Sequence, residues 1–230
     1  MDGKRISALL NIEKILDTIY PPKCGFCGEI DDRSICENCL KTVKNEAKCI
    51  KQSKTKENKE WNFDEHIYLF EYKGIIREKI LEYKFKDGAY LYKTFINILI
   101  NDKKICAILK SYDIITPVPM HYKKKLQRGY NQAELIAKNL YDYIEFVNIL
   151  KKVKNTAKQS ELTRKERLKN LKNAYNVNEK YKENIKNKKI LIFDDIFTTG
   201  STANECATEI RRFEPTKIGI LTIAKDFIEK

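Results

Sequence analysis

The sequence predicts an α/β protein with a mainly parallel sheet and flanking helices, preceded by a small cysteine-rich module. Three features of the 230-residue chain support this prediction. Short β-rich apolar runs alternate with helix-like runs, as is typical of parallel sheets. Four cysteines near the N-terminus fall into two close pairs. Near the C-terminus, an apolar strand ends in two acids and a hydroxyl-rich loop.

The bulk composition indicates a globular protein: 42% of the residues are hydrophobic and 10% are aromatic. The length suits one domain, or one domain with a small appendage. The first twenty residues space apolar side chains among charges, which predicts an amphipathic helix and not a signal peptide. No window is long and apolar enough to cross a membrane. We therefore expect a soluble cytoplasmic protein.

The net charge of +13 is unevenly distributed along the chain. Residues 41–60 carry seven Lys against three Glu, and residues 151–172 carry nine Lys or Arg against two Glu. A third basic cluster lies between them and consists of Lys123, Lys124, Lys125 and Arg128. Such a balance favours phosphate-rich partners, nucleic acid first. The alternative is that Lys simply coats solvated faces.

The paired cysteines, "CGFC" and "CENC", predict a metal site formed by Cys24, Cys27, Cys36 and Cys39. Two CxxC pairs can close a tetrahedral shell of four thiolates, which is typical of structural zinc. Four protein ligands leave no open position for catalysis. An iron–sulfur cluster is an alternative, and two disulfides are disfavoured in a reducing cytosol. The other cysteines are expected to be small apolar fillers: Cys49, Cys106 and Cys206.

Two regions are expected along the chain. Residues 1–60 would hold the N-terminal helix, the four-cysteine module and a basic linker, with a helix end and then a mobile stretch within 41–60. Residues 61–230 would form the α/β domain. Its first elements are predicted as a strand at 66–73, a helix at 74–85 and a helix at about 88–101.

The remaining elements continue the alternation. An apolar run at 112–119 must stop at Pro117 and Pro119, because proline cannot donate to a strand ladder. After it we predict a helix at 131–144, a strand at 146–150, a charged helix or loop at 160–172, a strand at 188–193, a helix at 200–213 and a strand at 217–225.

The stretch "ILIFDDIFTTGSTANECA" predicts a phosphate-binding turn. The N–H groups of the loop and of the first helical turn converge there, and the helix dipole favours an anion. Gly200 permits close backbone approach, and hydroxyls add donors. Asp194 and Asp195 would repel phosphate, so they suit sugar hydroxyls or a magnesium ion, which together describe a ribose 5-phosphate site. A capped helix explains the hydroxyls but not the paired acids.

The stretch "ILIFDDIFTTGST" resembles the phosphoribosyl pyrophosphate (PRPP) motif of type I phosphoribosyltransferases. Three further segments resemble those of the ComF family of competence proteins. They are "TPVPMHYKKKLQRGYNQAELIAKNL", "VKNTAKQSELTRKERLKNLKNAYNV" and "EYKGIIREKILEYKFKDG". With the double CxxC, the resemblance covers about the whole chain in the family's order. It implies a type I phosphoribosyltransferase fold after an N-terminal zinc-binding module.

The resemblance also implies roles for individual residues. Asp194 and Asp195 would hold the ribose hydroxyls of PRPP with Mg²⁺, and the 5-phosphate would lie on Thr198, Thr199, Gly200, Ser201 and Thr202. Candidates for pyrophosphate are Arg128 and Gly129, opening a helix, and Lys84. Gln159 and Arg167 lie in the segment that matches the mobile loop of type I enzymes. A surface arginine and a plain surface helix are the alternatives. Where many relatives have Arg, this chain has Lys152.

Two functions follow from the resemblance. The first is natural competence, in which the protein handles incoming single-stranded DNA alongside a helicase-like ATPase. Its DNA surface would use Tyr122, Lys123, Lys124, Lys125 and Tyr130. The second is a phosphoribosyltransferase of nucleotide metabolism, which would use Mg-PRPP and an unidentified base or amine acceptor. The sequence identifies no catalytic residue and no acceptor site, and it assigns no role to His66 or His121.

Overall fold

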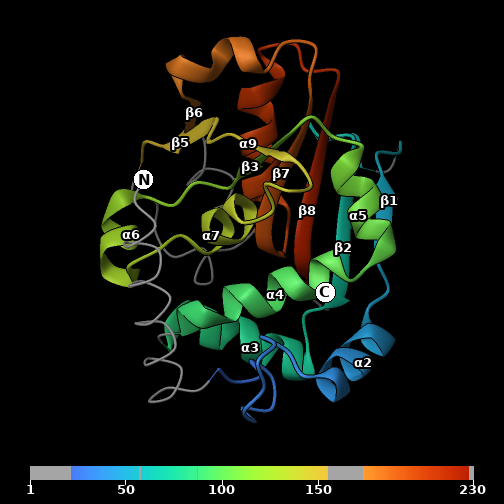
Figure 1. Ribbon diagram of the computed structural model, residues 1–230. Coiled ribbons are helices and arrows are strands. Elements are labelled where there is room, and N and C mark those ends of the chain that lie inside the picture. Colours follow the sequence, from blue (N-terminus) through green and yellow to red (C-terminus); the bar gives the residue numbers. More distant parts are fainter. Residues whose placement is uncertain (1–21, 57, 87, 155–172, 228–230) are drawn as a thin grey trace, which may run out of the picture.

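The computed structural model describes residues 22–56, 58–86, 88–154 and 173–227. Its centre is a six-stranded sheet with the order β1-β2-β8-β7-β3-β4, in which only β1 is antiparallel to its neighbour (Figure 1). The predicted α/β fold with a mainly parallel sheet is therefore confirmed. The strands of this sheet are β1 (Ile50–Ser53), β2 (Glu65–Glu71), β3 (Ile114–Pro117), β4 (Glu145–Phe146), β7 (Lys189–Phe197) and β8 (Lys217–Lys225). A separate antiparallel pair consists of β5 (Leu150–Lys152) and β6 (Tyr175–Val177).

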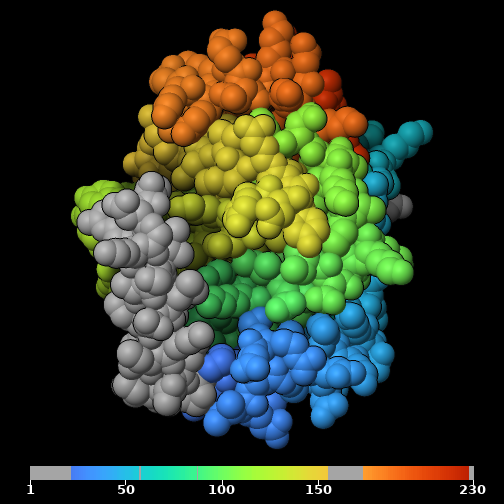
Figure 2. All heavy atoms as spheres, in the orientation of Figure 1, coloured from blue at the N-terminus to red at the C-terminus, as the bar shows by residue number. Residues whose placement is uncertain are grey.

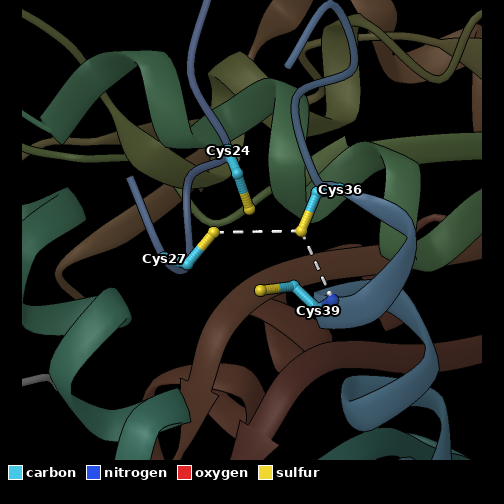
Figure 3. Close-up of side chains that lie close together, drawn as sticks. All are labelled: Cys24, Cys27, Cys36 and Cys39. Carbon is cyan, nitrogen blue, oxygen red and sulfur yellow. Dashed lines mark hydrogen bonds between the residues drawn. The ribbon is translucent and has the colours of Figure 1, made fainter. Parts of the chain in front are cut away.

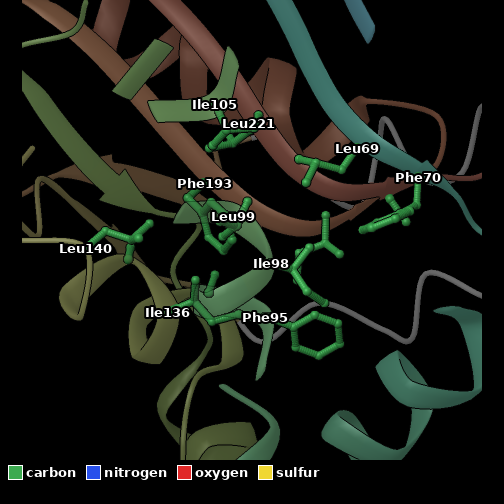
Figure 4. Packing of buried hydrophobic residues seen from close by; sticks show 14 of the residues in the cluster. Leu69, Phe70, Phe95, Ile98, Leu99, Ile105, Ile136, Leu140, Phe193 and Leu221 are labelled. Atoms are coloured by element: carbon green, nitrogen blue, oxygen red, sulfur yellow. The ribbon is translucent and has the colours of Figure 1, made fainter. Parts of the chain in front are cut away.

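Helices cover both faces of the sheet. One face packs against α3 (Gly74–Phe85), α4 (Leu91–Ile100), α5 (Lys103–Lys110) and α7 (Gln132–Lys138), and the other packs against α9 (Ser201–Arg211). Central strands buried on both faces read as continuous apolar runs, which explains "KILIF" and "KIGILTIA" in β7 and β8. Figure 4 shows α4 side chains facing the sheet, with Leu99 near Phe193.

Most predicted elements lie where the sequence placed them. The helix at 74–85 and the strand at 217–225 match α3 and β8 residue for residue, while the helix at 131–144 ends as α7 at Lys138. Two short helices, α5 and α6 (Tyr122–Arg128), were not predicted. Each begins at a side-chain cap. Asp102 accepts from the backbone N–H groups of Lys104 and Ile105, and His121 accepts from that of Lys123.

The stretch predicted as a mobile linker contains a strand, so that prediction is wrong for residues 50–53. After helix α2 (Glu37–Glu46), β1 pairs with β2 in the register Ile50 with Tyr68. Side chains of β1 also contact the neighbouring strands: Lys51 Nζ lies 2.9 Å from Glu65 Oε2, and Lys225 Nζ lies 2.7 Å from Gln52 Oε1. The boundary at residue 60 stays a prediction. Among the described helices, none has the length and apolar character needed to cross a membrane.

Candidate functional site

The four predicted cysteine ligands converge. All four sulfur atoms lie within 4.8 Å of one another, and the Sγ atoms of Cys27 and Cys36 are 3.8 Å apart (Figure 3). Tetrahedral zinc with Zn–S bonds of about 2.3 Å places its sulfur atoms roughly 3.8 Å apart, so this set fits the ion. All four are free thiols, which does not support the disulfide alternative. The backbone N–H of Cys39 donates to Cys36 Sγ at 3.5 Å, as expected for a thiolate ligand.

The cysteine cluster is docked on helix α4. Thr94 Oγ1 donates to the carbonyl oxygen of Ser34 at 2.7 Å, and Asn97 Nδ2 donates to Ser34 Oγ at 2.9 Å. Val43 of α2 is buried in the same hydrophobic cluster as Phe95. On the face drawn in Figure 2, the N-terminal residues (blue) continue without a break into α4 and α5 (green). The cysteine cluster is therefore packed against the same hydrophobic core as helix α4.

A cavity of about 1020 Å³ lies at the carboxyl ends of β3, β7 and β8. Ligands of open α/β sheets bind at this edge, because loops and helix N-termini converge there. The cavity brings together the predicted acids and the Gly200 loop, Arg128, and Lys84, which come from three separate stretches of the chain. Its wall also includes Lys124, Gln127, Gln132, Lys152, Tyr130, Tyr175 and Thr222.

The two acids belong to strand β7, which runs on to Phe197 instead of ending at Phe193 as predicted. Asp194 pairs with Thr222 of β8, and the backbone N–H of Asp195 donates to Asp194 Oδ1 at 2.9 Å. Burial, and then repulsion from Asp195, raises the pKa of Asp194 to about 7. Asp194 is therefore harder to ionise than an exposed aspartate.

Lys84 contacts one of the two acids, Asp195, directly. Its Nζ lies 2.7 Å from Asp195 Oδ1, and the side chains are only 19% and 10% exposed, respectively. The sequence predicted Lys84 as a pyrophosphate ligand. The structure places it in the cavity wall, in an ion pair with a predicted ribose ligand.

The loop after β7 has the form expected of a phosphate cradle. Gly200 has φ +74°, and an added Cβ would lie 2.4 Å from the ring of Phe197, so glycine is required both for conformation and for space. The hydroxyls of Thr199 and Ser201 lie 2.8 Å apart. Helix α9 begins at Ser201, and its first N–H groups lie at the cavity together with Thr198 and Thr202.

Arg128 ends helix α6, so the prediction that Arg128 and Gly129 open the next helix is wrong. Gly129 has φ +86° and closes α6 as a left-handed C-cap, and α7 starts at Gln132. A guanidinium nitrogen of Arg128 donates to Gln132 Oε1 at 2.7 Å, and the group lies 4.8 Å from the ring centre of Phe85. Burial lowers the pKa of Arg128.

Gln132 is a cavity residue that the sequence analysis did not select. Its side chain is 2% exposed, and its Nε2 has no hydrogen-bond partner in the described part of the chain. Because Arg128 fixes Oε1 as the acceptor, Nε2 is a buried donor without an acceptor, which is a costly arrangement in a folded protein. The tract "RGYNQA" was a signal for this region, but it gave no reason to prefer the glutamine.

Lys152 reaches the same cavity from β5. Burial, and then repulsion from Lys124, lowers the pKa of Lys152 to about 8. Its Nζ lies 5.1 Å from the ring centre of Tyr175. A cation of this kind gains from a phosphate ligand, because an anion nearby would restore its usual pKa.

Helix α6 presents the predicted basic cluster at the rim of the cavity. It has no buried residue, and Tyr122 and Leu126 are 62% and 80% exposed. Lys123 and Lys125 are exposed, and Lys125 Nζ lies 2.7 Å from Glu134 Oε2. Tyr130 lies in the cavity wall and not on the open surface, because its hydroxyl donates to the carbonyl oxygen of Tyr83.

The remaining candidates lie elsewhere. Gln159 and Arg167 fall outside the described residues. His121 caps α6. His66 is fully buried beneath the cavity, with Nε2 2.9 Å from Thr222 Oγ1. Burial, with a smaller effect of Lys225, lowers the pKa of His66 to about 3, so this ring is neutral.

Two family models match separate regions of the chain. A double zinc ribbon domain family matches residues 15–64, and the phosphoribosyl transferase domain family matches residues 126–228. Together with the four-cysteine cluster, the first match supports structural zinc. A solved purine phosphoribosyltransferase from Pyrococcus horikoshii covers 59% of this chain and 83% of its own, at 15% identity and a TM-score of 0.35, which is too low to add to the assignment.

Curated relatives cover most of the chain. Competence protein F of Haemophilus influenzae is 29% identical over 210 residues, which are 89% of this chain and 85% of that protein. Competence protein ComFC of Streptococcus pneumoniae is 28% identical over 79% of this chain and 77% of its own length. DNA utilization protein YhgH of Escherichia coli is 30% identical over 44% of each. The chain is therefore similar to competence proteins F and ComFC over most of its length, with a match to a double zinc ribbon domain followed by a match to a phosphoribosyl transferase domain.

Proposed function

We propose that this chain binds PRPP with Mg²⁺ in the cavity at the end of β7, and that it handles single-stranded DNA in natural competence. The observation that carries the proposal is that one cavity holds a pair of acids beside a phosphate-type loop and, from other elements, two cationic side chains. The acids and the Gly200 loop lie on β7 and α9, and Arg128 and Lys152 reach the same space from other elements. A sugar with phosphates at both ends matches this arrangement.

Each part of the ligand has a place in the proposal. The 5-phosphate would lie on the Gly200 loop and the N-terminus of α9, and the ribose hydroxyls would donate to Asp194 and Asp195. The diphosphate would then lie toward Arg128 and Lys152. Magnesium would neutralise charge on the diphosphate. Asp194 and Asp195, together with the ribose hydroxyls bound to them, would hold that ion nearby.

The test of ligand binding is calorimetry of Mg-PRPP with the wild type and with the double variant Asp194→Asn/Asp195→Asn. We expect the variant to lose at least about tenfold in affinity, because neutral amides replace two charged acceptors. Ribose 5-phosphate, titrated in parallel, measures the contribution of the loop and the acids to binding without the diphosphate. Equal affinity of both proteins for Mg-PRPP would contradict the proposed pocket.

The DNA part of the proposal rests on helix α6 and on the rim of the cavity. Exposed lysines beside exposed Tyr122 and Phe85, the latter 69% exposed, suit phosphate contacts combined with base stacking. Relatives named as competence and DNA utilization proteins support this direction. Action in the cytoplasm beside a helicase-like ATPase follows from the family resemblance and belongs to the same proposal.

The DNA surface is tested by the double variant Lys123→Ala/Lys125→Ala. We expect weaker single-stranded DNA binding and a salt slope reduced by about 1 to 2, because two phosphate contacts are lost. The matched control is Lys103→Ala/Lys104→Ala, which removes the same charge from two exposed positions on α5. An equal loss in both variants would assign the binding to net charge and not to α6.

A catalytic phosphoribosyltransferase is the second candidate, and the size of the cavity favours it. A volume of about 1020 Å³ is at the upper end of ligand pockets and leaves room for an acceptor beside the sugar phosphate. Release of pyrophosphate from Mg-PRPP in the presence of a panel of bases and amines tests this function. Binding without release for every acceptor would leave PRPP as a ligand and not a substrate.

A further inference from the structure

The ion pair between Lys84 and Asp195 competes with the role proposed for Asp195. An ammonium 2.7 Å from Oδ1 occupies one side of a carboxylate that is only 10% exposed. A ribose hydroxyl or a metal ion approaching this oxygen must displace the ammonium or share the space with it. Both side chains line the cavity, so the contact lies inside the binding site and not behind it.

The charges around the acids make Lys84 their principal counter-ion. In the ranges that the structure describes, Lys84 is the one cation within 4.0 Å of either Asp194 or Asp195. Arg128 is held by Gln132, and Lys152 lies over Tyr175. Without Lys84, two adjacent carboxylates would share a poorly solvated strand end, which is strongly unfavourable.

The contact is also well suited to exchange. Desolvation offsets much of the Coulomb attraction in a buried pair, so its net stabilisation is small. Lys84 lies in the last turn of α3, and its four-carbon stem lets a compact ammonium move without the helix. A divalent cation carries twice the charge and can replace it at the carboxylate.

We propose that Lys84 is a displaceable counter-ion. It neutralises Asp195 in the protein alone, and it transfers to the diphosphate when a divalent cation and the sugar phosphate take its place. The second half of this proposal rests on the proposed function, because it needs PRPP as the ligand. The first half concerns only the acids, Lys84 and the metal ion.

The test replaces Lys84 by Met, which keeps the stem and removes the charge. We expect Mn²⁺ alone, measured by electron paramagnetic resonance at pH 8, to bind roughly tenfold more tightly, because its internal competitor is gone. Mg-PRPP, measured by calorimetry, is expected to bind roughly tenfold more weakly, because the diphosphate loses a cation. A residue with only a structural role would not move the two affinities in opposite directions.

Lys79→Met is the matched control. Lys79 lies on the same helix, Lys79 Nζ is 3.0 Å from Glu82 Oε2, and its side chain is 15% exposed, but it does not line the cavity. Both affinities should stay at the wild-type value in this variant. Lys84→Gln, which can still donate to Asp195 without charge, serves as a second variant if Lys84→Met does not fold, and it should also tighten Mn²⁺ binding.

The outcomes separate the two proposals. Unchanged or weaker Mn²⁺ binding in the Lys84 variants overturns the counter-ion role, whatever PRPP does. Tighter Mn²⁺ binding in a protein that binds no PRPP supports the counter-ion role and overturns the proposed function. If Mn²⁺ binds more tightly and Mg-PRPP binds as well as to the wild type, the transfer to the diphosphate is wrong.

Discussion

At the scale of one residue, Asp194 lowers the stability of the folded protein at neutral pH. Its pKa of about 7 lies well above the value of about 3.9 for an unfolded chain. The folded protein therefore holds a proton that the unfolded chain releases, and the fold loses stability as the pH rises from about 4 to about 7. Binding residues often carry such a penalty, because a ligand later supplies the missing partner.

We predict that Asp194→Asn stabilises the protein at pH 8, by about 2 kcal/mol, and has little effect near pH 4. The amide keeps the acceptor for the N–H of Asp195 and removes the charge. Urea unfolding of both proteins at a series of pH values measures the difference. A constant difference across the series would mean that the carboxylate is not destabilised by its site.

Gln132→Glu tests the unpaired donor beside Arg128. The carboxylate would pair with the guanidinium, so we expect the melting temperature to rise at pH 7 while affinity for inorganic pyrophosphate falls at least about tenfold. Gln127→Glu, which also lines the cavity, is the control for the change in net charge. Equal losses in both variants would point to repulsion in general and not to the Arg128 pair.

At the scale of elements, two glycines set how the cavity is framed. Gly129 ends α6 and Gly200 opens α9, and both have positive φ. They differ in their surroundings, because an added Cβ meets nothing within 4 Å at Gly129 and meets the Phe197 ring at Gly200. Glycine is favoured at position 129 by the positive φ alone, and at position 200 also because the Phe197 ring leaves no room for a Cβ.

We therefore expect Gly129→Ala to lower the free energy of unfolding by about 1 kcal/mol. Gly200→Ala should cost clearly more, on the order of 2 to 4 kcal/mol, because the Cβ displaces a buried ring. Denaturant unfolding of the pair measures both values. A similar cost at the two positions would show that Phe197 yields easily and that the loop is less constrained than its geometry indicates.

The elements also show how far the sequence leads. The spacing of Ile76, Ile80 and Tyr83 placed α3, and the continuous apolar run "KIGILTIA" placed β8. The PRPP-like motif selected the acids and the loop. Strand β1 escaped prediction because "IKQS" has one apolar residue and owes its conformation to β2. Gln132 and the Lys84–Asp195 pair also escaped, since both depend on distances between segments that only the tertiary structure sets.

At the scale of the whole molecule, the cysteine cluster is expected to support the entire fold. Cys36→Ser should lower the melting temperature of the whole chain in one transition, because α2 and Ser34 pack on α4 and α4 packs on the sheet. Differential scanning calorimetry and the zinc content by mass spectrometry measure this. Two separate transitions would show instead that the cluster unfolds alone.

Strand β1 has a consequence for how this protein can be rearranged in evolution. Residues 50–53 complete the sheet. The zinc-binding module therefore cannot be gained, lost or exchanged as a segment that ends just before Trp61. A chain shortened to that point would uncover the edge of β2, whose residues 65–70 are buried, and such an edge invites pairing with other copies. Viable recombination must therefore carry β1 along with the rest of the sheet.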